Sequence, residues 1–112
     1  MALPTPLPPE LTELIAARFR LLAEPMRVRI LDRLRDGERS VGELVAELGT
    51  TQQNVSKHLS ILNRDGVLGR RKDGNRAVYW IADESVLDLC EHVCGSVERR
   101  AAELSRLVSQ AG

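Results

Sequence analysis

Two cysteines that lie four residues apart near the C-terminal end are the side chains best suited to bind a soft ion or to be oxidised. If their segment is helical, the spacing of Cys90 and Cys94 places both sulfur atoms on one face of the helix. Thiolates are soft donors that suit As(III), zinc or Cu(I). One pair is too few ligands, because zinc takes four and As(III) commonly takes more than two. A second subunit would have to supply the rest.

The same cysteine pair allows two other interpretations. Alpha carbons four residues apart in a helix are separated by about 6.2 Å, which is within the disulfide range, so an oxidant could join the two thiols at the cost of strain in the helix. Cysteine also behaves as a small buried hydrophobe, so Cys90 and Cys94 could serve packing alone. The spacing is compatible with metalloid binding, oxidation and packing.

Basic residues are concentrated in one segment, although the whole chain is neutral, with 16 basic and 16 acidic residues. Between Thr50 and Trp80 there are six basic residues and only two acidic ones, whereas the rest of the chain has an acidic excess. A basic surface on an acidic body attracts phosphates, because neutralised phosphates release their counterions. The alternative is a solvated surface with unevenly distributed charge.

The elements that must position these charges begin with a pair of short helices. Ser40 and Glu43 have the spacing of a capping box, and the helix that they open should end at Gly49. Thr50 and Gln53 repeat the signature and predict a second helix, whose inward face holds Val55, Leu59 and Leu62. Two helices joined by a short turn containing glycine indicate a helix-turn-helix, whose second helix can enter a DNA major groove.

A basic hairpin should follow the second of these helices. Val67-Leu68 and Ala77–Ile81 are strand-like runs, and Asp73-Gly74-Asn75 between them is typical of a tight turn. Basic side chains would then cluster at and below the tip of this hairpin, which we call the wing. Two strands are not stable alone in water, so the wing must pack on the helices.

A long helix should start after Asp83 and reach about Ser109. Apolar side chains recur along it in alternating steps of three and four, which is a heptad repeat. This apolar seam consists of Leu87, Cys90, Cys94, Val97, Ala101, Leu104 and Val108. Such a helix would be roughly 35–40 Å long, comparable to the diameter of a small domain. The seam therefore predicts a homodimer in which two copies of this helix pack together.

The N-terminal part should supply two further helices. The first should begin near Pro9 and Glu10, with an apolar stripe of Leu11, Leu14, Ile15, Phe19 and Leu22. The second should begin at Pro25, end before Gly37 and bury Met26, Ile30, Leu31 and Leu34. We expect a flexible Pro-rich arm over residues 1–9 and a single DNA-binding and dimerisation domain over residues 10–110.

Other classes of protein are less compatible with the sequence. It has no run of about 18 apolar residues and no signal-peptide pattern, which favours a soluble cytoplasmic protein. No nucleophile–base pair, phosphate loop or complete metal set is apparent, so the chain is not expected to be an enzyme. A winged-helix module that binds another protein is the alternative to a DNA-binding regulator.

The pattern resembles the ArsR/SmtB family of bacterial winged-helix repressors. The likeness covers about residues 15 to 108, and it is carried by Phe19–Leu31, Asn54–Leu62, Gly66–Leu68 and the wing end Val78–Trp80. The resemblance implies a mainly α-helical winged helix-turn-helix with a small β-hairpin, in the order four helices, two strands and one helix. It also implies a homodimer formed through the first and last helices. The implied activity is binding to a palindromic operator on double-stranded DNA, relieved by a metal, a metalloid or an oxidant.

Base contacts are expected from Gln52, Gln53 and Ser56, because Gln can pair with adenine and Ser can contact any base. Lys57 and Arg64 are expected to contact phosphates. In sequences that resemble this one, the residue equivalent to His58 usually bonds within the fold or to a phosphate rather than to a metal. The full predicted set of DNA-binding residues is Thr51, Gln52, Gln53, Ser56, Lys57, His58, Arg64, Arg70, Arg71, Lys72 and Arg76.

The chain departs from the best-known metal sites of the family that it resembles. The helix after Ser40 has no cysteine pair, and in the last helix Cys90 and Glu103 stand where an aspartate and a histidine ligand would be. His92 should point away from the two cysteines. The resemblance therefore favours As(III) or a thiol-reactive signal at Cys90 and Cys94 over zinc or nickel.

Overall fold

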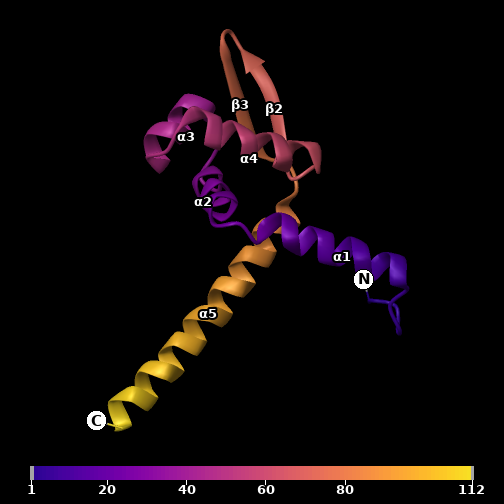
Figure 1. Cartoon of the computed structure of the whole chain (residues 1–112), viewed down its shortest axis with the longest axis vertical. Helices are drawn as coiled ribbons and strands as arrows, with labels where there is room; N and C mark the ends of the chain where they lie inside the picture. Colours follow the sequence, from indigo (N-terminus) through magenta and orange to yellow (C-terminus); the bar gives the residue numbers. More distant parts are fainter. Residues whose placement is uncertain (1, 112) are drawn as a thin grey trace. The chain divides into compact units, whose positions relative to one another are not determined.

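The computed structural model divides the chain into two compact units, Met1–Ala82 and Asp83–Gly112, and describes residues 2–111. The first unit contains, in order, α1 (Pro9–Leu22), α2 (Pro25–Leu34), β1 (Arg39–Ser40), α3 (Val41–Leu48), α4 (Gln52–Arg64), β2 (Leu68–Asp73) and β3 (Arg76–Ile81) (Figure 1). The second unit is the helix α5 (Glu84–Ala111). The predicted winged helix-turn-helix is confirmed, with one strand, β1, that the sequence did not predict.

Side-chain caps fix where the helices of the helix-turn-helix begin. At α3 the predicted capping box is present: the Ser40 hydroxyl accepts from the Glu43 N–H at 3.1 Å, and the Ser40 N–H donates to the Glu43 carboxylate at 2.9 Å. At α4 the prediction was wrong by one residue. The Thr51 hydroxyl, not that of Thr50, accepts from the Asn54 N–H, at 3.1 Å. Thr50 instead accepts from the Asn54 side-chain amide at 3.2 Å.

The core of the first unit lies among α2, α3 and α4. Its fully buried side chains are Ile30 and Leu31 of α2, Leu44 of α3, Val55, Leu59 and Leu62 of α4, and Val67 before β2. The predicted inward face of α4 is therefore confirmed. Burying each such side chain stabilises the fold by about 1.5–3 kcal/mol. Of the residues predicted to be buried on α2, Ile30, Leu31 and Leu34 are buried, and Met26 is half-buried.

The apolar stripe of α1 is only partly covered. Leu21 and Leu22 at its end are buried, whereas Leu14 and Phe19 are 68% and 53% exposed. Leu11 and Ile15 are half-buried. The helix is thus amphipathic as predicted, but its apolar face extends beyond the side chains that the described chain packs against it.

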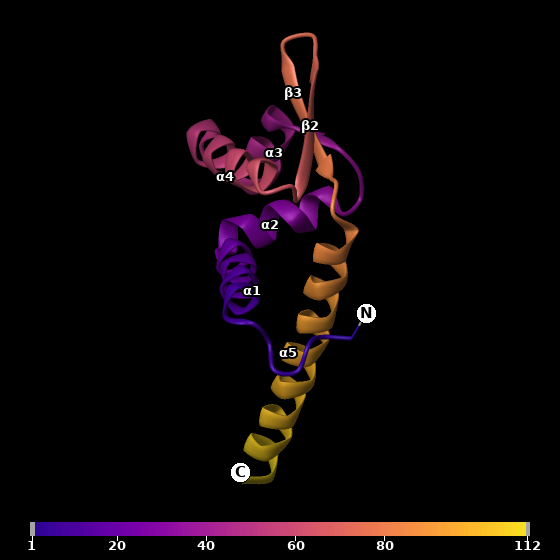
Figure 2. The same ribbon diagram turned by 90° about the vertical axis from the view of Figure 1, so that its right-hand side faces the viewer.

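The three strands form an antiparallel sheet in the order β1-β3-β2. Asp73 pairs with Arg76, so the turn of the hairpin is the two residues Gly74-Asn75 and not the predicted three. Gly74 has φ of 65°, and no described residue other than glycine has a positive φ, which fits a type II′ turn with glycine at its first central position. Figures 1 and 2 show the hairpin projecting beyond α3 and α4.

Strand β1 was missed because two residues cannot display an alternating pattern. Arg39 pairs with Tyr79, and Ser40 pairs with Val78. Since Ser40 is also the N-cap of α3, this short strand connects the base of the wing to the start of the helix-turn-helix.

Helix α5 begins at a side-chain cap, as predicted. The Asp83 carboxylate accepts from the Ser85 N–H at 3.1 Å and from the Ser85 hydroxyl at 2.5 Å. The helix runs for 28 residues to Ala111, slightly past the predicted end near Ser109. Among residues 2–111, no helix is both long and apolar enough to cross a membrane. The predicted arm includes Met1, which lies outside the described residues; α1 already begins at Pro9, the last residue of that arm.

Candidate nucleic-acid interface

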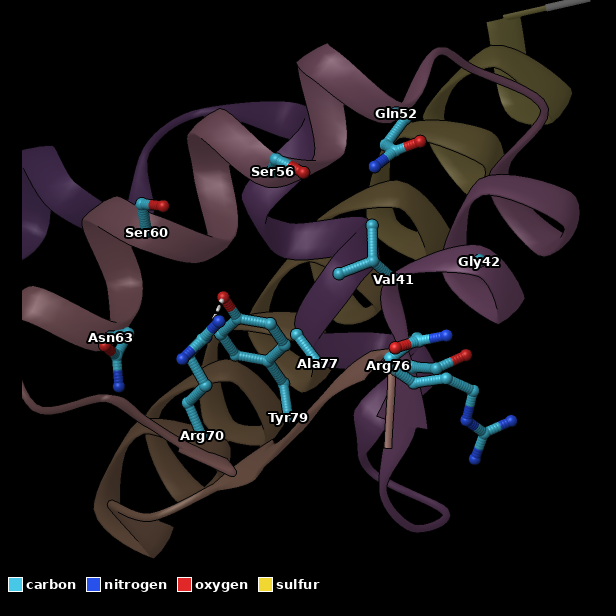
Figure 3. A pocket seen from close by; sticks show the side chains of 12 residues that line it. Val41, Gly42, Gln52, Ser56, Ser60, Asn63, Arg70, Arg76, Ala77 and Tyr79 are labelled. Carbon is cyan, nitrogen blue, oxygen red and sulfur yellow. Dashed lines mark hydrogen bonds between the residues drawn. The ribbon is translucent and has the colours of Figure 1, made fainter. Parts of the chain in front are cut away.

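A groove of about 680 Å³ lies between α4 and the wing (Figure 3). Four polar side chains at helical spacing line it from α4: Gln52, Ser56, Ser60 and Asn63. The hairpin and the start of α3 line the other sides with Arg70, Asn75, Arg76, Ala77, Tyr79, Ser40, Val41 and Gly42. None of these described lining residues is acidic, and two are arginines. The groove therefore offers hydroxyl and amide groups together with positive charge, a combination that suits nucleic acid.

Buried residues hold α4 in place against the wing. Val55 and Leu59 have no exposed surface and fix the inner face of the helix, so the opposite, polar face is presented outward. At the end of α4, the Asn63 side-chain amide donates to the Leu68 carbonyl of β2 at 2.9 Å. The recognition face of α4 and the wing are thereby joined directly.

On the wing side, the groove contains a tyrosine–arginine pair. Tyr79 is only 5% exposed, and its hydroxyl accepts a hydrogen bond from the Arg70 Nε at 3.1 Å. The Arg70 guanidinium carbon also lies 5.9 Å from the centre of the Tyr79 ring. Figure 3 shows the two side chains meeting in the groove beneath Ser56 and Ser60.

Arg71 has different surroundings, although it is the next residue. Its guanidinium makes two hydrogen bonds to the Glu38 carboxylate, at 2.5 and 2.6 Å. It also lies 5.8 Å from the centre of the Trp80 ring. The hydrogen bonds from Arg71 lower the pKa of Glu38 below its ordinary value, so the carboxylate remains charged. The charge of Arg71 is therefore balanced by an acid of its own chain.

Trp80 lies against a glycine on the same face of the hairpin. Gly69 pairs with Trp80 across the strands, and a Cβ atom at position 69 would overlap the indole ring. The ring occupies the space that a side chain would need, so the close packing of Trp80 requires glycine at this position.

The remaining predicted DNA-binding residues lie at the surface, with one exception. Four members of the predicted set line the groove: Gln52, Ser56, Arg70 and Arg76. The members that are exposed outside the groove are Thr51, Gln53, Lys57, Arg64, Arg71 and Lys72. The carboxylate of Asp73 lies 3.9 Å from an Nη nitrogen of Arg76.

His58 is the exception, because its side chain is buried within the fold. Its side chain is 5% exposed, and Nδ1 accepts from the Arg27 Nε at 3.1 Å. Its Nε2 lies 3.7 Å from the Glu24 carboxylate. Arg27 also donates to the Leu21 carbonyl at 3.0 Å. Burial lowers the pKa of the His58 imidazole, which favours the neutral ring that accepts from Arg27. His58 thus connects α4 to the α1–α2 corner.

The predicted DNA-binding set contains four of the twelve described residues that line the groove, and Ser60, Asn63 and Tyr79 are among those that it missed. Ser60 and Asn63 continue the polar face of Gln52 and Ser56 in helical steps, so extending that face along α4 would have found them. Tyr79 gave no such signal, because a tyrosine in a strand is usually a packing residue. Only the register of β2 against β3 places it opposite Arg70.

The cysteine pair lies on α5 as predicted. Cys90 is half-buried and Cys94 is exposed, and no disulfide joins them. The Cys94 thiol lies 3.6 Å from a carboxylate oxygen of Glu98, one helical turn later. Burial raises the pKa of the Cys90 thiol, which favours the protonated form. Within residues 2–111, no group of three or more His, Cys, Asp or Glu side chains is arranged to hold a metal ion.

Much of the apolar seam of α5 is exposed. Val97, Leu104 and Val108 have 61%, 46% and 73% of their surface open to solvent. These fractions are large for aliphatic side chains that share one face of a helix.

The fold and the groove define a winged helix-turn-helix protein, and comparison with known proteins gives the same class. Residues 22–70 match the family described as "Helix-turn-helix domain". An uncharacterised HTH-type transcriptional regulator of Mycobacterium tuberculosis, Rv0081, is 42% identical over 80 residues, which cover 70% of each chain. The HTH-type transcriptional repressor SmtB of the same organism is 38% identical over 93 residues, covering 80% of this chain and 69% of SmtB.

Solved structures agree. The crystal structure of M. tuberculosis Rv0081 has a TM-score of 0.76 at 37% identity, covering 83% of this chain and 94% of that one. The antimony-specific transcriptional repressor AntR has a TM-score of 0.77 at 29% identity, with 85% and 86% coverage. A homodimeric winged helix-turn-helix domain of Mycobacterium bovis Mb0332, described as a possible ArsR-family regulator, has a TM-score of 0.71 at 31% identity, with 80% and 82% coverage.

The chain belongs to the ArsR/SmtB family of winged helix-turn-helix transcriptional regulators, which confirms the resemblance seen in the sequence. The relatives named here are regulators and not enzymes, as predicted.

Proposed function

We propose that this chain is a homodimeric repressor that binds a palindromic operator on double-stranded DNA through α4 and the wing. We expect it to act in the cytoplasm, because the operator DNA that it is proposed to bind lies there. The observation that carries the proposal is the groove between α4 and the wing, which has two arginines, several amide and hydroxyl groups and no acidic residue among its described lining. In this proposal Gln52, Gln53 and Ser56 read bases, while Lys57, Arg64 and the wing contact phosphates.

The homodimer is supported by the exposed apolar residues of two helices. Val97, Leu104 and Val108 are exposed on α5, and Leu14 and Phe19 are exposed on α1. A twofold partner would remove these side chains from water, and it would present two copies of α4 to the two halves of a palindrome. The M. bovis structure similar to this chain is described as homodimeric.

Specific binding can be tested by selecting duplexes from a random-sequence pool with the purified protein. The selected sites should be palindromic, and the logarithm of the affinity should fall linearly with the logarithm of salt concentration. Gln53→Ala should relax the selected sequence at one position of each half-site. The matched control is Lys57→Ala, which should weaken binding to selected and scrambled duplexes alike. Equal affinity for every duplex would reject sequence-specific repression.

A second part of the proposal concerns the inducer. We propose that As(III) or another thiol-reactive signal acts at Cys90 and Cys94 and releases the DNA, with further ligands supplied by the partner subunit. Both thiols lie on one helix, in the seam where the partner subunit is proposed to approach them and supply further ligands. The similar AntR is named as antimony-specific, and antimony shares the thiol chemistry of arsenic. The alternative is that the pair forms a disulfide under oxidation or only packs.

The inducer proposal is tested with a double variant, Cys90→Ser with Cys94→Ser. It should dimerise and bind the selected duplex like the wild type, yet remain bound when arsenite is added. Peroxide, added separately to the wild type, distinguishes oxidation from metalloid binding. Release of the double variant by arsenite at the wild-type concentration would rule out these thiols as the sensing site.

A further inference from the structure

The two adjacent arginines of β2 lie on opposite faces of the wing. Side chains alternate along a strand, so Arg70 shares a face with its cross-strand partner Tyr79, and Arg71 shares the other face with Trp80. The first face lines the groove beside α4, as the labelled side chains in Figure 3 show. Only one of the two arginines is therefore directed to the surface that is proposed to receive DNA.

Arg70 is held in a defined position with part of its guanidinium left for a ligand. Its Nε donates to the Tyr79 hydroxyl at 3.1 Å, and Tyr79 is itself 5% exposed and thus fixed by its surroundings. In the part of the chain that the structure describes, the two Nη groups of Arg70 have no hydrogen-bond or ion-pair partner. A guanidinium fixed at Nε can present its Nη groups to a phosphate with little further loss of side-chain freedom.

Arg71 is engaged within the fold. Both of its Nη groups donate to the Glu38 carboxylate, and its guanidinium lies over the Trp80 ring. Glu38 belongs to the segment between α2 and β1, so this pair attaches the back of the wing to the helical body. A phosphate would have to compete with a carboxylate that is already bound at two points.

We infer that Arg70, positioned by the Tyr79 hydroxyl, is the phosphate-binding arginine of β2, and that Arg71 instead secures the wing through Glu38. The inference rests on the proposed function and deepens it by naming which residue binds the backbone. The partner is the phosphate of the DNA strand that occupies the groove between α4 and the wing. Ser60 on the opposite wall gives the same strand a hydroxyl donor from α4.

Neighbouring alanine variants provide a matched test, because each removes one positive charge from the same strand. Affinity for the selected palindromic duplex is measured over a range of salt concentrations for Arg70→Ala and Arg71→Ala. Arg70→Ala should reduce the slope of log K against log salt by about 0.9 per subunit, and weaken binding about eightfold per subunit near 0.1 M salt. Arg71→Ala should leave the slope unchanged. An unchanged slope for Arg70→Ala, or an equal reduction for Arg71→Ala, overturns the inference.

The positioning role of Tyr79 is tested with Tyr79→Phe, which keeps the ring and removes the hydroxyl. It should weaken binding about threefold per subunit in the wild-type background, which is the size expected for losing one hydrogen bond. It should cause no further loss when combined with Arg70→Ala. Equal losses in both backgrounds would mean that the hydroxyl supports the wing generally and does not position Arg70. Thermal melts of each variant report any loss of folding.

The two proposals fail in different ways. If the wild-type protein shows no salt-dependent binding to any duplex, the proposed function fails and this inference fails with it. If the wild type binds but Arg70→Ala binds with the same slope, only the assignment of Arg70 is wrong.

Discussion

Helices α4 and α5 carry similar apolar repeats but bury them to opposite extents. Val55 and Leu59 of α4 have no exposed surface, whereas Val97 and Val108 in the seam of α5 are 61% and 73% exposed. Apolar periodicity thus identifies which face of a helix avoids water, but it does not identify what covers that face. For α4 the cover is the core of its own unit. For α5 we propose that it is a second copy of the chain.

The largest expected effect comes from the covered helix. Leu59→Ala should lower the free energy of unfolding by about 2–5 kcal/mol, because it leaves a cavity where the side chain had no exposed surface. Urea unfolding followed by circular dichroism measures this loss. A loss below about 1 kcal/mol would contradict the packing described for α4.

A loss of association is expected at the exposed helix. Leu104→Ala should raise the dimer dissociation constant about 100-fold, because a twofold interface loses two leucine contacts, each contributing about 1.4 kcal/mol. Sedimentation equilibrium measures the change. Arg106→Ala, on the opposite face of α5, is the control and should dimerise normally. Equal dimer dissociation constants for Leu104→Ala and the wild type would show that the seam of α5 is not the dimer interface.

A smaller effect tests the start of α4. Thr51→Ala should destabilise the protein by about 1 kcal/mol, because it removes the acceptor for the Asn54 N–H. Thr50→Ala is the matched control and should cost less, since Thr50 accepts only from the Asn54 side chain. The urea midpoints of unfolding measure the two losses of stability. A larger loss for Thr50→Ala than for Thr51→Ala would place the cap of α4 at Thr50.

The smallest effect concerns pH and the buried imidazole. Burial lowers the pKa of His58 in the folded protein below its usual 6.5, so the unfolded chain binds the proton more readily. The nearby Glu24 carboxylate opposes this shift, while Lys57 and Arg27 add to it. The contribution of His58 to the free energy of unfolding should therefore be fully present above pH 6.5. It should decrease as the pH drops from 6.5 toward the lower pKa of the folded state.

Melting temperatures at a series of pH values test this dependence. His58→Gln should flatten the acid side of the profile. The same acid dependence in His58→Gln and in the wild type would assign it to other groups.

The order of helices, the capping box and the buried face of α4 were predictable because each depends on residues close together in sequence. Gln52 and Ser56 were found in the same way. The features that the sequence did not predict have a different origin. The buried position of His58 depends on Arg27, 31 residues away, and β1 exists only through its pairing with Tyr79 and Val78. Strand register and long-range hydrogen bonds decided these features, and neither has a local sequence signal.

Trp80 is the only tryptophan of the chain, and it lies on the wing between Gly69 and Arg71. Intrinsic fluorescence excited at the indole band therefore reports on this hairpin alone, without an attached dye. Titrating DNA or arsenite while following that emission would reveal whether the wing changes its surroundings when either is added, and stopped-flow mixing would give the rate.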